Sequence, residues 1–317
     1  KYIHVGGDEV DKTAWSNCKK CKAYCEKKKI SDMLALQSDF MKYFDQWLTK
    51  RKRIMIGWDE ILEGGLAPAA TVMSWRGIQG GIDAATMGHD VVMSPGKPCY
   101  FDHYQAEPVY EPLAIGGLNT LKDVYEFEPI PFELDAKYRK HVLGGQGNMW
   151  TEFMTNFDHV QYMLLPRMPA LAEALWTKSE LKNWDSFAKR LKPFKERWSS
   201  DSIAIGPEHR GIRFSVMNQD GRAFIKMSGE VTDATIVYTT NSTDPTASDS
   251  IFKNPIPLRN NTEIRAQWMR NDSLLYPNPI IQNFTYHLGV EAQVVWEQGP
   301  SAKYPAEGLN SIANGIK

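Results

Sequence analysis

The stretch RIMIGWDEILEGGLAPAATVMSWRG, residues 53–77, contains two short apolar runs that each end in a tryptophan beside charged side chains. The runs are Arg53–Trp58 and Thr71–Trp75, and the segment ILEGGLAPAA between them is expected to form a helix. Nearly continuous apolar strands are typical of a parallel sheet that is covered on both faces, and parallel strands need a crossover between them. The stretch therefore predicts a strand–helix–strand unit of an α/β fold.

The same alternation extends over roughly the first 200 residues. Apolar side chains recur at helical spacing in residues 31–50, 82–89 and 158–175, which predicts three further helices. Five strands are predicted, and they end near Gly7, Trp58, Trp75, Pro95 and Met149. A polar or aromatic cluster follows each strand: GGDE, GWDE, SWRG, YFDHY and NMWTE.

These clusters favour one kind of α/β fold over another. A (β/α)8 barrel builds its site from the C-terminal ends of successive strands, whereas an open doubly wound sheet binds its ligand at one switch point. We therefore predict a partial (β/α)8 TIM barrel with five of the eight strands, in a domain of residues 1–203.

The pattern changes after about Ser202, where helical stripes give way to short β runs. Turn-rich segments such as NQDG and NSTDPTAS separate these runs, which predicts a small all-β antiparallel sandwich over residues 204–288. Residues 289–317 are interpreted as a tail or as the start of a truncated further module. The chain begins without Met inside an expected strand, so we interpret it as a piece of a longer protein.

The composition excludes several classes of protein. Of the 317 residues, 42% are hydrophobic and 24% are charged, which is typical of a globular protein and argues against disorder. The formal net charge of −1 offers no basic surplus for a nucleic-acid partner. No apolar run is long enough to span a membrane.

Three of the four cysteines, Cys18, Cys21 and Cys25, lie in the segment CKKCKAYC, and the fourth is Cys99. A zinc site would require a fourth ligand, and none stands nearby in the sequence. A Cys18–Cys21 disulfide and free thiols that cap a turn are the other interpretations. The spacing leaves all three open.

Asp8 and Glu9 form an adjacent acid pair at the end of the first predicted strand, directly after two glycines. Glycine lets the backbone turn sharply, so both carboxylates can lean into one pocket. Trp58, Trp75 and Trp150 stand at the ends of three other strands. Indole faces suit the C–H faces of a sugar, while carboxylates bind its hydroxyls, so the pattern favours a carbohydrate pocket.

The segment HVGGDE, residues 4–9, resembles the H-x-G-G-D-E signature of the β-N-acetylhexosaminidases of glycoside hydrolase family 20. The similarity covers about residues 1–200 and continues, in order, through GWDE, VMSWRG, YFDHY, GGQGNMWTE and PRMPALAEALW. Residues 204–288 resemble the immunoglobulin-like domain that often follows this catalytic domain. The resemblance implies a retaining exo-glycosidase for terminal β-linked GlcNAc or GalNAc, with a periplasmic or secreted location.

The resemblance also implies roles for individual residues, because in this family the acetamide oxygen of the substrate attacks the anomeric carbon and forms an oxazolinium intermediate. Glu9 would act as general acid and then as general base, and Asp8 would stay ionised and hold the acetamide N–H. Tyr100 would donate its O–H to the acetamide oxygen. The remaining predicted site residues would bind the sugar: Trp58, Trp75 and Trp150 through the acetamide and the ring face, Asp102 and Glu152 through hydroxyls.

Two features of the family are missing from the matched region. The arginine that grips the outer hydroxyls belongs near the first barrel strand, and residues 106–149 lack a pocket tryptophan that some bacterial members have. Two alternatives to the proposed chemistry stay open. One is a carbohydrate-binding scaffold or incompetent fragment without turnover, and the other is a classical retaining glycosidase with Asp8 as covalent nucleophile.

Other polar residues receive structural interpretations. We expect Asp59 and Glu60 to cap the helix that follows them, and His4 and His103 to be structural histidines. Motifs for phosphate binding, zinc proteolysis and the nucleophile elbow do not occur in the sequence, and no metal or organic cofactor is expected. The expected partner is a carbohydrate substrate, and the oligomeric state is open.

Overall fold

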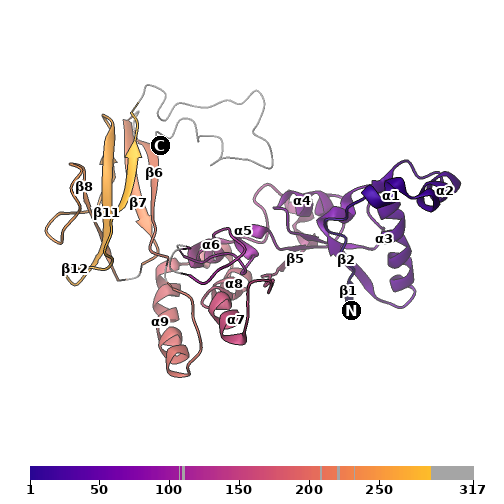
Figure 1. Cartoon of the computed structure of the whole chain (residues 1–317), viewed down its shortest axis with the longest axis horizontal. Helices are drawn as coiled ribbons and strands as arrows, with labels where there is room; N and C mark the ends of the chain where they lie inside the picture. The colour runs from indigo at the N-terminus through magenta and orange to yellow at the C-terminus, as the bar shows by residue number, and fades with distance from the viewer. Residues whose placement is uncertain (107, 109–110, 208, 220–221, 232, 287–317) are drawn as a thin grey trace. The chain divides into compact units, whose positions relative to one another are not determined.

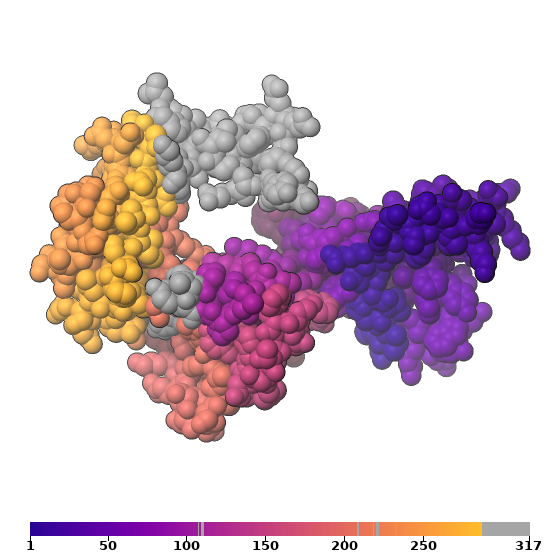
Figure 2. All heavy atoms as spheres, in the orientation of Figure 1, coloured from indigo at the N-terminus to yellow at the C-terminus, as the bar shows by residue number. Residues whose placement is uncertain are grey.

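The structure is a computed structural model that describes residues 1–106, 108, 111–207, 209–219, 222–231 and 233–286 (Figure 1). It divides into two compact units, of which the first is Lys1–Gly206 and the second begins at Pro207. Figure 2 shows their heavy atoms, coloured along the chain. The tail predicted at residues 289–317 lies outside the described residues. In the described part of the chain, no helix is both long and apolar enough to cross a membrane.

The first unit is built on a sheet of five parallel strands in the order β1-β2-β3-β4-β5. Sheet order follows chain order, as it does in a TIM barrel, so the prediction of a partial barrel is confirmed. Among the described residues β1 and β5 form the two edges. The strands are β1 (Tyr2–His4), β2 (Ile54–Trp58), β3 (Thr71–Ser74), β4 (Val91–Met93) and β5 (Val142–Gly145).

Helical segments connect these strands, and two of the helices pack against β2, β3 and β4. The segments between β1 and β4 are α1 (Thr13–Asn17), α2 (Lys19–Lys28), α3 (Met33–Thr49), η1 (Asp59–Leu62) and α4 (Gln79–Thr86). Those between β4 and β5 are α5 (Gly96–Cys99), α6 (Leu121–Glu126) and η3 (Ala136–His141). After β5 follow α7 (Phe157–Leu164), α8 (Arg167–Trp176), η4 (Ser179–Leu181) and α9 (Trp184–Ser200).

Helix α3 shows how the sequence produces this packing. Asp32 begins the helix, because its carboxylate accepts a hydrogen bond from the amide of Ala35 at 2.8 Å. The apolar stripe of the helix then turns Met41 and Leu48 into the core, where they join the buried strand residue Met55. Burial of this stripe fixes α3 against β2 and so fixes the position of the end of that strand.

Two predicted helices differ in the structure. The segment ILEGGLAPAA forms only the short η1, because Gly64 takes a left-handed conformation, with φ of +71°, that packs directly against the backbone of Leu34. The helix expected at residues 158–175 is two helices, α7 and α8. The break falls at Pro166, which has no amide hydrogen to continue the ladder of the preceding turn.

The second unit consists of antiparallel sheets, which confirms the predicted all-β sandwich. One sheet has the order β10-β7-β6, and the other has the order β12-β11-β8-β9, with β13 paired to β11. Ile225, Ile264 and Phe284 pack between them in one core. The strands are β6 (Ile212–Gln219), β7 (Arg222–Gly229), β8 (Thr235–Thr239), β9 (Ser250–Ile251), β10 (Ile256–Pro257), β11 (Thr262–Arg270), β12 (Ser273–Leu274) and β13 (Ile280–Phe284).

All four cysteines are free thiols in the structure. The Sγ atom of Cys18 accepts a hydrogen bond from the amide of Cys21 at 3.4 Å, so Cys18 caps the start of α2. No group of three or more His, Cys, Asp or Glu side chains that could hold a metal occurs within the described ranges. The structure therefore agrees with the interpretation of the cysteines as free thiols, and Cys18 is the one that caps a helix.

Candidate active site

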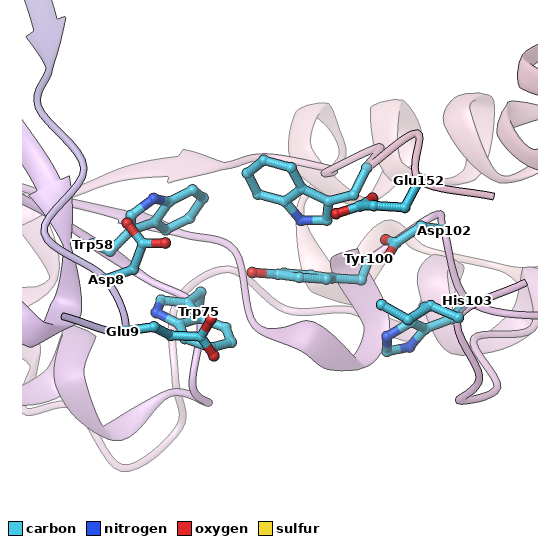
Figure 3. Close-up of a pocket in the computed structure, with 10 residues that line it drawn as sticks. Asp8, Glu9, Trp58, Trp75, Tyr100, Asp102, His103 and Glu152 are labelled. Carbon is cyan, nitrogen blue, oxygen red and sulfur yellow. The ribbon is translucent and has the colours of Figure 1, made fainter. Parts of the chain in front are cut away.

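A pocket of about 380 Å³ lies where the strands of the first unit end (Figure 3). It brings together residues that are up to 144 positions apart, from Asp8 to Glu152. Two residues that sequence reasoning left out, His103 and Ile115, also line it. All eight predicted site residues line the pocket: Asp8, Glu9, Trp58, Trp75, Tyr100, Asp102, Trp150 and Glu152.

The acid pair is directed into the pocket by a sharp turn after β1. Gly7 has φ of +105°, and a Cβ atom there would lie 2.7 Å from the Cγ2 atom of Ile61. The carbonyl oxygen of Gly7 accepts a hydrogen bond from Nε2 of Gln37 on α3 at 2.8 Å. Glu9 itself has φ of +47°, a conformation that costs free energy for a residue with a side chain. The turn leaves both carboxylates, Asp8 and Glu9, exposed at the rim of the pocket.

Four aromatic rings form a closed set around the pocket. Trp58 lies 6.4 Å from Trp75 and 5.9 Å from Trp150, measured between ring centroids. Tyr100 closes the circle, because it stacks on Trp75 at 6.2 Å and lies 6.4 Å from Trp150. Such rings present an apolar wall with fixed geometry. The four rings come from residues that end or follow four different strands, which explains why no local segment of sequence contains the wall.

The hydroxyl group of Tyr100 carries a proton that it can donate to a ligand in this pocket. Burial raises the pKa of Tyr100 to about 12, so the phenol keeps its proton at physiological pH. Figure 3 shows its oxygen on the side of the pocket where Asp8 and Glu9 lie. The main chain here is held by the amide of Phe101, which donates to the carbonyl oxygen of Asn148 at 2.7 Å.

Asp102 is the most deeply buried carboxylate of the pocket, with 5% of its surface exposed. Burial raises its pKa to about 6, and the nearby carboxylate of Glu152 adds to the shift. Its Oδ1 atom is buried without a hydrogen-bond partner among the described residues. A buried, unpartnered acceptor that lines a pocket is suited to bind a hydroxyl group of a ligand.

The loop that carries Asp102 is held by Arg167, a fully buried residue of α8. Its guanidinium donates to the carbonyl oxygens of Phe101 at 2.6 Å and of His103 at 3.0 Å. It also donates to the carbonyl oxygens of Asn119 and Met163. Arg167 therefore ties the pocket loop to the helix behind it.

The raised pKa of Asp102 predicts a pH-dependent effect on stability. A carboxyl group whose pKa is higher in the folded state contributes stability that is complete below about pH 4 and is lost as the pH rises through about 6. We expect Asp102→Asn to increase the free energy of unfolding at pH 7 by about 1–3 kcal/mol and to have little effect at pH 4. Urea unfolding of the full-length protein at both pH values measures this.

Glu133→Gln is the control for this prediction, because Glu133 is an exposed carboxylate that does not line the pocket. It should change the free energy of unfolding by no more than about 0.5 kcal/mol at either pH. An Asp102→Asn variant whose stability differs from that of the wild type equally at pH 4 and pH 7 would contradict the argument.

Asp59 and Glu60 do not cap η1, so that interpretation is wrong. Both side chains are buried and turn toward the end of β3. Asp59 Oδ2 accepts hydrogen bonds from the main-chain amides of Trp75 at 3.1 Å and Arg76 at 3.2 Å. Glu60 Oε2 accepts a hydrogen bond from the indole Nε1 of Trp75 at 2.9 Å. A single 3-10 turn presents these side chains to the neighbouring strand rather than to its own amides.

The two histidines differ from each other. His4 packs edge-on against Trp58 at 4.9 Å, and its Nδ1 accepts a hydrogen bond from the amide of Gly6, as expected of a structural residue. His103 lines the pocket beside Tyr100, and its Nδ1 atom lies 3.2 Å from Nδ2 of Asn119, so it has a structural partner as well as a place in the pocket wall. The position of His103 within the YFDHY motif was the available signal. Ile115 lies in a loop outside all motifs, and no sequence signal pointed to it.

Comparison with protein-family models shows to which family the unit with this pocket belongs. The model described as glycosyl hydrolase family 20, catalytic domain, matches residues 1–179, which is more than half of the chain. The chain belongs to glycosyl hydrolase family 20. A second model, the chitobiase/beta-hexosaminidase C-terminal domain, matches residues 218–275 of the second unit.

Curated relatives and solved structures of family 20 agree with this assignment. A beta-hexosaminidase from Porphyromonas gingivalis is 40% identical over 267 residues, which cover 80% of this chain and 33% of the relative. A crystal structure of a family 20 exo-β-N-acetylglucosaminidase from Vibrio harveyi, in complex with N-acetylglucosamine, has a TM-score of 0.58 and 29% identity. That alignment covers 64% of this chain and 32% of that chain. The chain thus spans about a third of the length of these family 20 proteins.

Proposed function

We propose that the full-length protein is a retaining exo-β-N-acetylhexosaminidase that removes terminal β-linked GlcNAc or GalNAc. The observation that carries this proposal is that one pocket combines an adjacent acid pair, a protonated tyrosine and a closed set of aromatic rings. Membership of family 20 supports it, as does the Vibrio harveyi structure with bound N-acetylglucosamine. The substrate class supports a periplasmic or secreted location.

In the first step, the acetamide oxygen of the substrate attacks C1, and the bond from C1 to the leaving oxygen breaks. Glu9 donates its proton to the leaving oxygen. Asp8 accepts a hydrogen bond from the acetamide N–H and stabilises the positive charge of the oxazolinium ring as it forms. Tyr100 donates a hydrogen bond to the acetamide oxygen and orients it. The aromatic rings exclude water around the acetamide.

In the second step, the carboxylate of Glu9 removes a proton from water, and the water oxygen attacks C1. The bond from C1 to the acetamide oxygen breaks, which restores the acetamide. Two successive inversions at C1 give net retention of the β configuration. Asp102 and Glu152 lie at the opposite end of the pocket from Glu9 and would bind hydroxyls on the non-reducing side of the sugar (Figure 3).

A substrate without the acetamide tests this mechanism. We expect the full-length protein to cleave an aryl β-GlcNAc at least about 10³-fold more efficiently than the matching aryl β-glucoside, because the internal nucleophile is lost. Proton NMR during the reaction should show the β-anomer of the free sugar first. Comparable cleavage of the glucoside would instead support Asp8 as covalent nucleophile, and early appearance of the α-anomer would exclude retention.

A second candidate function is carbohydrate binding without turnover. The open edges of the described sheet, β1 and β5, favour it for the present chain, because unpaired strand edges leave the frame of the pocket incomplete. Titration of residues 1–317 with GlcNAc, beside a turnover assay of the same sample, separates the two candidates. Binding without release of the aryl group supports the second candidate for this chain, and turnover excludes it.

A further inference from the structure

We propose that Glu60 is a positioning residue, which fixes the indole ring of Trp75 and so sets the size of the N-acyl group that the pocket accepts. This inference rests on the proposed function, because it takes Trp75 to form part of the wall around the acetamide. It concerns selectivity among N-acylated sugars rather than the chemistry of cleavage.

The contact between the two side chains is specific. Glu60 is 7% exposed, and its Oε2 atom accepts a hydrogen bond from the indole Nε1 of Trp75 at 2.9 Å. An indole ring has only this one donor and no acceptor. A hydrogen bond to a carboxylate is also stronger than a bond to a neutral oxygen. The bond therefore fixes the rotation of the ring as well as its position.

The backbone of Trp75 is held from the same turn. Asp59, 2% exposed, accepts hydrogen bonds from the main-chain amides of Trp75 and Arg76 through one oxygen. Its other oxygen pairs with Nε of Arg76 at 2.6 Å. Helix α4 closes this arrangement, because a Cβ atom at Gly80 would lie 2.8 Å from Cβ of Asp59. The neighbouring carboxylates of Asp59 and Glu60 thus hold the main chain and the indole ring of Trp75, respectively.

Stability alone does not account for two adjacent buried carboxylates. Burying a charge costs free energy that a pairing partner often offsets only in part. Arg76 pairs closely with Asp59 but lies 3.8 Å from Oε1 of Glu60, and its second close partner is Glu63 at 2.9 Å. The Oε2 atom of Glu60 instead accepts its hydrogen bond from the indole of Trp75. We therefore explain the burial of the Glu60 carboxylate by its role in holding Trp75, which forms part of the pocket wall.

The fixed ring affects the rest of the pocket. Trp75 stacks on Tyr100 with an angle of 26° between the planes and meets Trp58 edge-on at 74°. A wall held at both ends cannot move away from an acyl group that is longer than acetyl. One extra methylene in such a pocket changes kcat/KM by about 10–200-fold. We therefore expect strong preference for N-acetyl over N-propanoyl sugars.

The test compares aryl β-glucosaminides that carry N-acetyl and N-propanoyl groups, with the full-length protein. Glu60→Leu removes the acceptor while keeping the bulk, and we expect it to reduce the ratio of the two kcat/KM values at least about fivefold. Glu60→Gln keeps an acceptor oxygen for Nε1 and should restore the ratio. Glu63→Leu is the matched control, because Glu63 pairs with Arg76 without contacting the indole, and its ratio should equal that of the wild type.

Trp75→Phe provides a second test if Glu60→Leu does not fold. It removes the indole N–H, which is the other partner of the same hydrogen bond, so we expect a similar loss of selectivity. Equal loss of kcat/KM on both substrates in Glu60→Leu, with the ratio unchanged, would overturn the proposal. A wild type that cleaves neither substrate refutes the proposed function instead. In that case the selectivity of the pocket is measured as the ratio of the binding affinities for free N-acetylglucosamine and N-propanoylglucosamine.

Discussion

Glu9→Gln is expected to lower kcat/KM of the full-length protein on an aryl β-GlcNAc by about 10²–10⁴-fold, the usual contribution of a general acid and base. Glu9 follows β1 at the rim of the pocket, where the turn directs its carboxyl group toward the aromatic wall. The amide of glutamine can still form hydrogen bonds, but it cannot transfer a proton. The variant should therefore bind substrate and fail in turnover, with the loss in kcat rather than in KM.

A series of leaving groups sharpens this experiment. A leaving group that departs easily needs no proton, so the loss caused by Glu9→Gln in the first step should shrink as the acidity of the leaving phenol increases. Asp11→Asn is the matched control, because Asp11 is an exposed carboxylate two positions further along that does not line the pocket. Its turnover should stay within about twofold of the wild type. An undiminished rate in Glu9→Gln would refute the assigned role.

Asp8→Asn is expected to lower kcat by about 10²–10³-fold, which is the usual effect of removing one group that stabilises charge in a transition state. Asp8 lines the same pocket as Glu9, on the side that faces away from Asp102 and Glu152 (Figure 3). An asparagine in its place offers no negative charge to the oxazolinium ring. The loss should therefore be large even on substrates with excellent leaving groups, which separates this variant from Glu9→Gln.

Added azide distinguishes two explanations for a loss of activity in Asp8→Asn, namely loss of a charge that stabilises the oxazolinium and loss of a covalent nucleophile. If the acetamide of the substrate is the nucleophile, azide cannot replace the missing carboxylate, and the rate of Asp8→Asn should stay low. Rescue by azide with an inverted glycosyl azide as product would identify Asp8 as a covalent nucleophile. A thiazoline analogue of the oxazolinium should in turn inhibit the wild type much more tightly than Asp8→Asn, since its ring mimics the charged intermediate.

The sequence predicted eight residues of this pocket from motifs that lie at or after the ends of successive strands. Asp8 follows β1, Trp58 ends β2 and Trp75 follows β3. Parallel strands bring their C-terminal ends to one edge of a sheet, so a local motif at each strand end is enough to predict a shared pocket. The predicted helices failed where local glycine and proline chemistry outweighed apolar spacing, as in residues 61–70 and at Pro166.

The remaining parts of the site depend on contacts between distant segments. Glu60 was predicted to be a cap because its neighbours in sequence suggest one, and only the packing of η1 against β3 turns it toward Trp75. The pKa of Asp102 depends on its burial, and Arg167 of the distant helix α8 holds the loop that carries it.

The sequence by itself therefore determined the order of the strands, the acid pair and the tryptophans, since these follow from periodicity and from short motifs. The tertiary structure alone decided which carboxylate is buried, which indole is held and that His103 and Ile115 line the pocket. Burial and hydrogen-bond partners are properties of a packed arrangement in space, and no stretch of neighbouring residues specifies them.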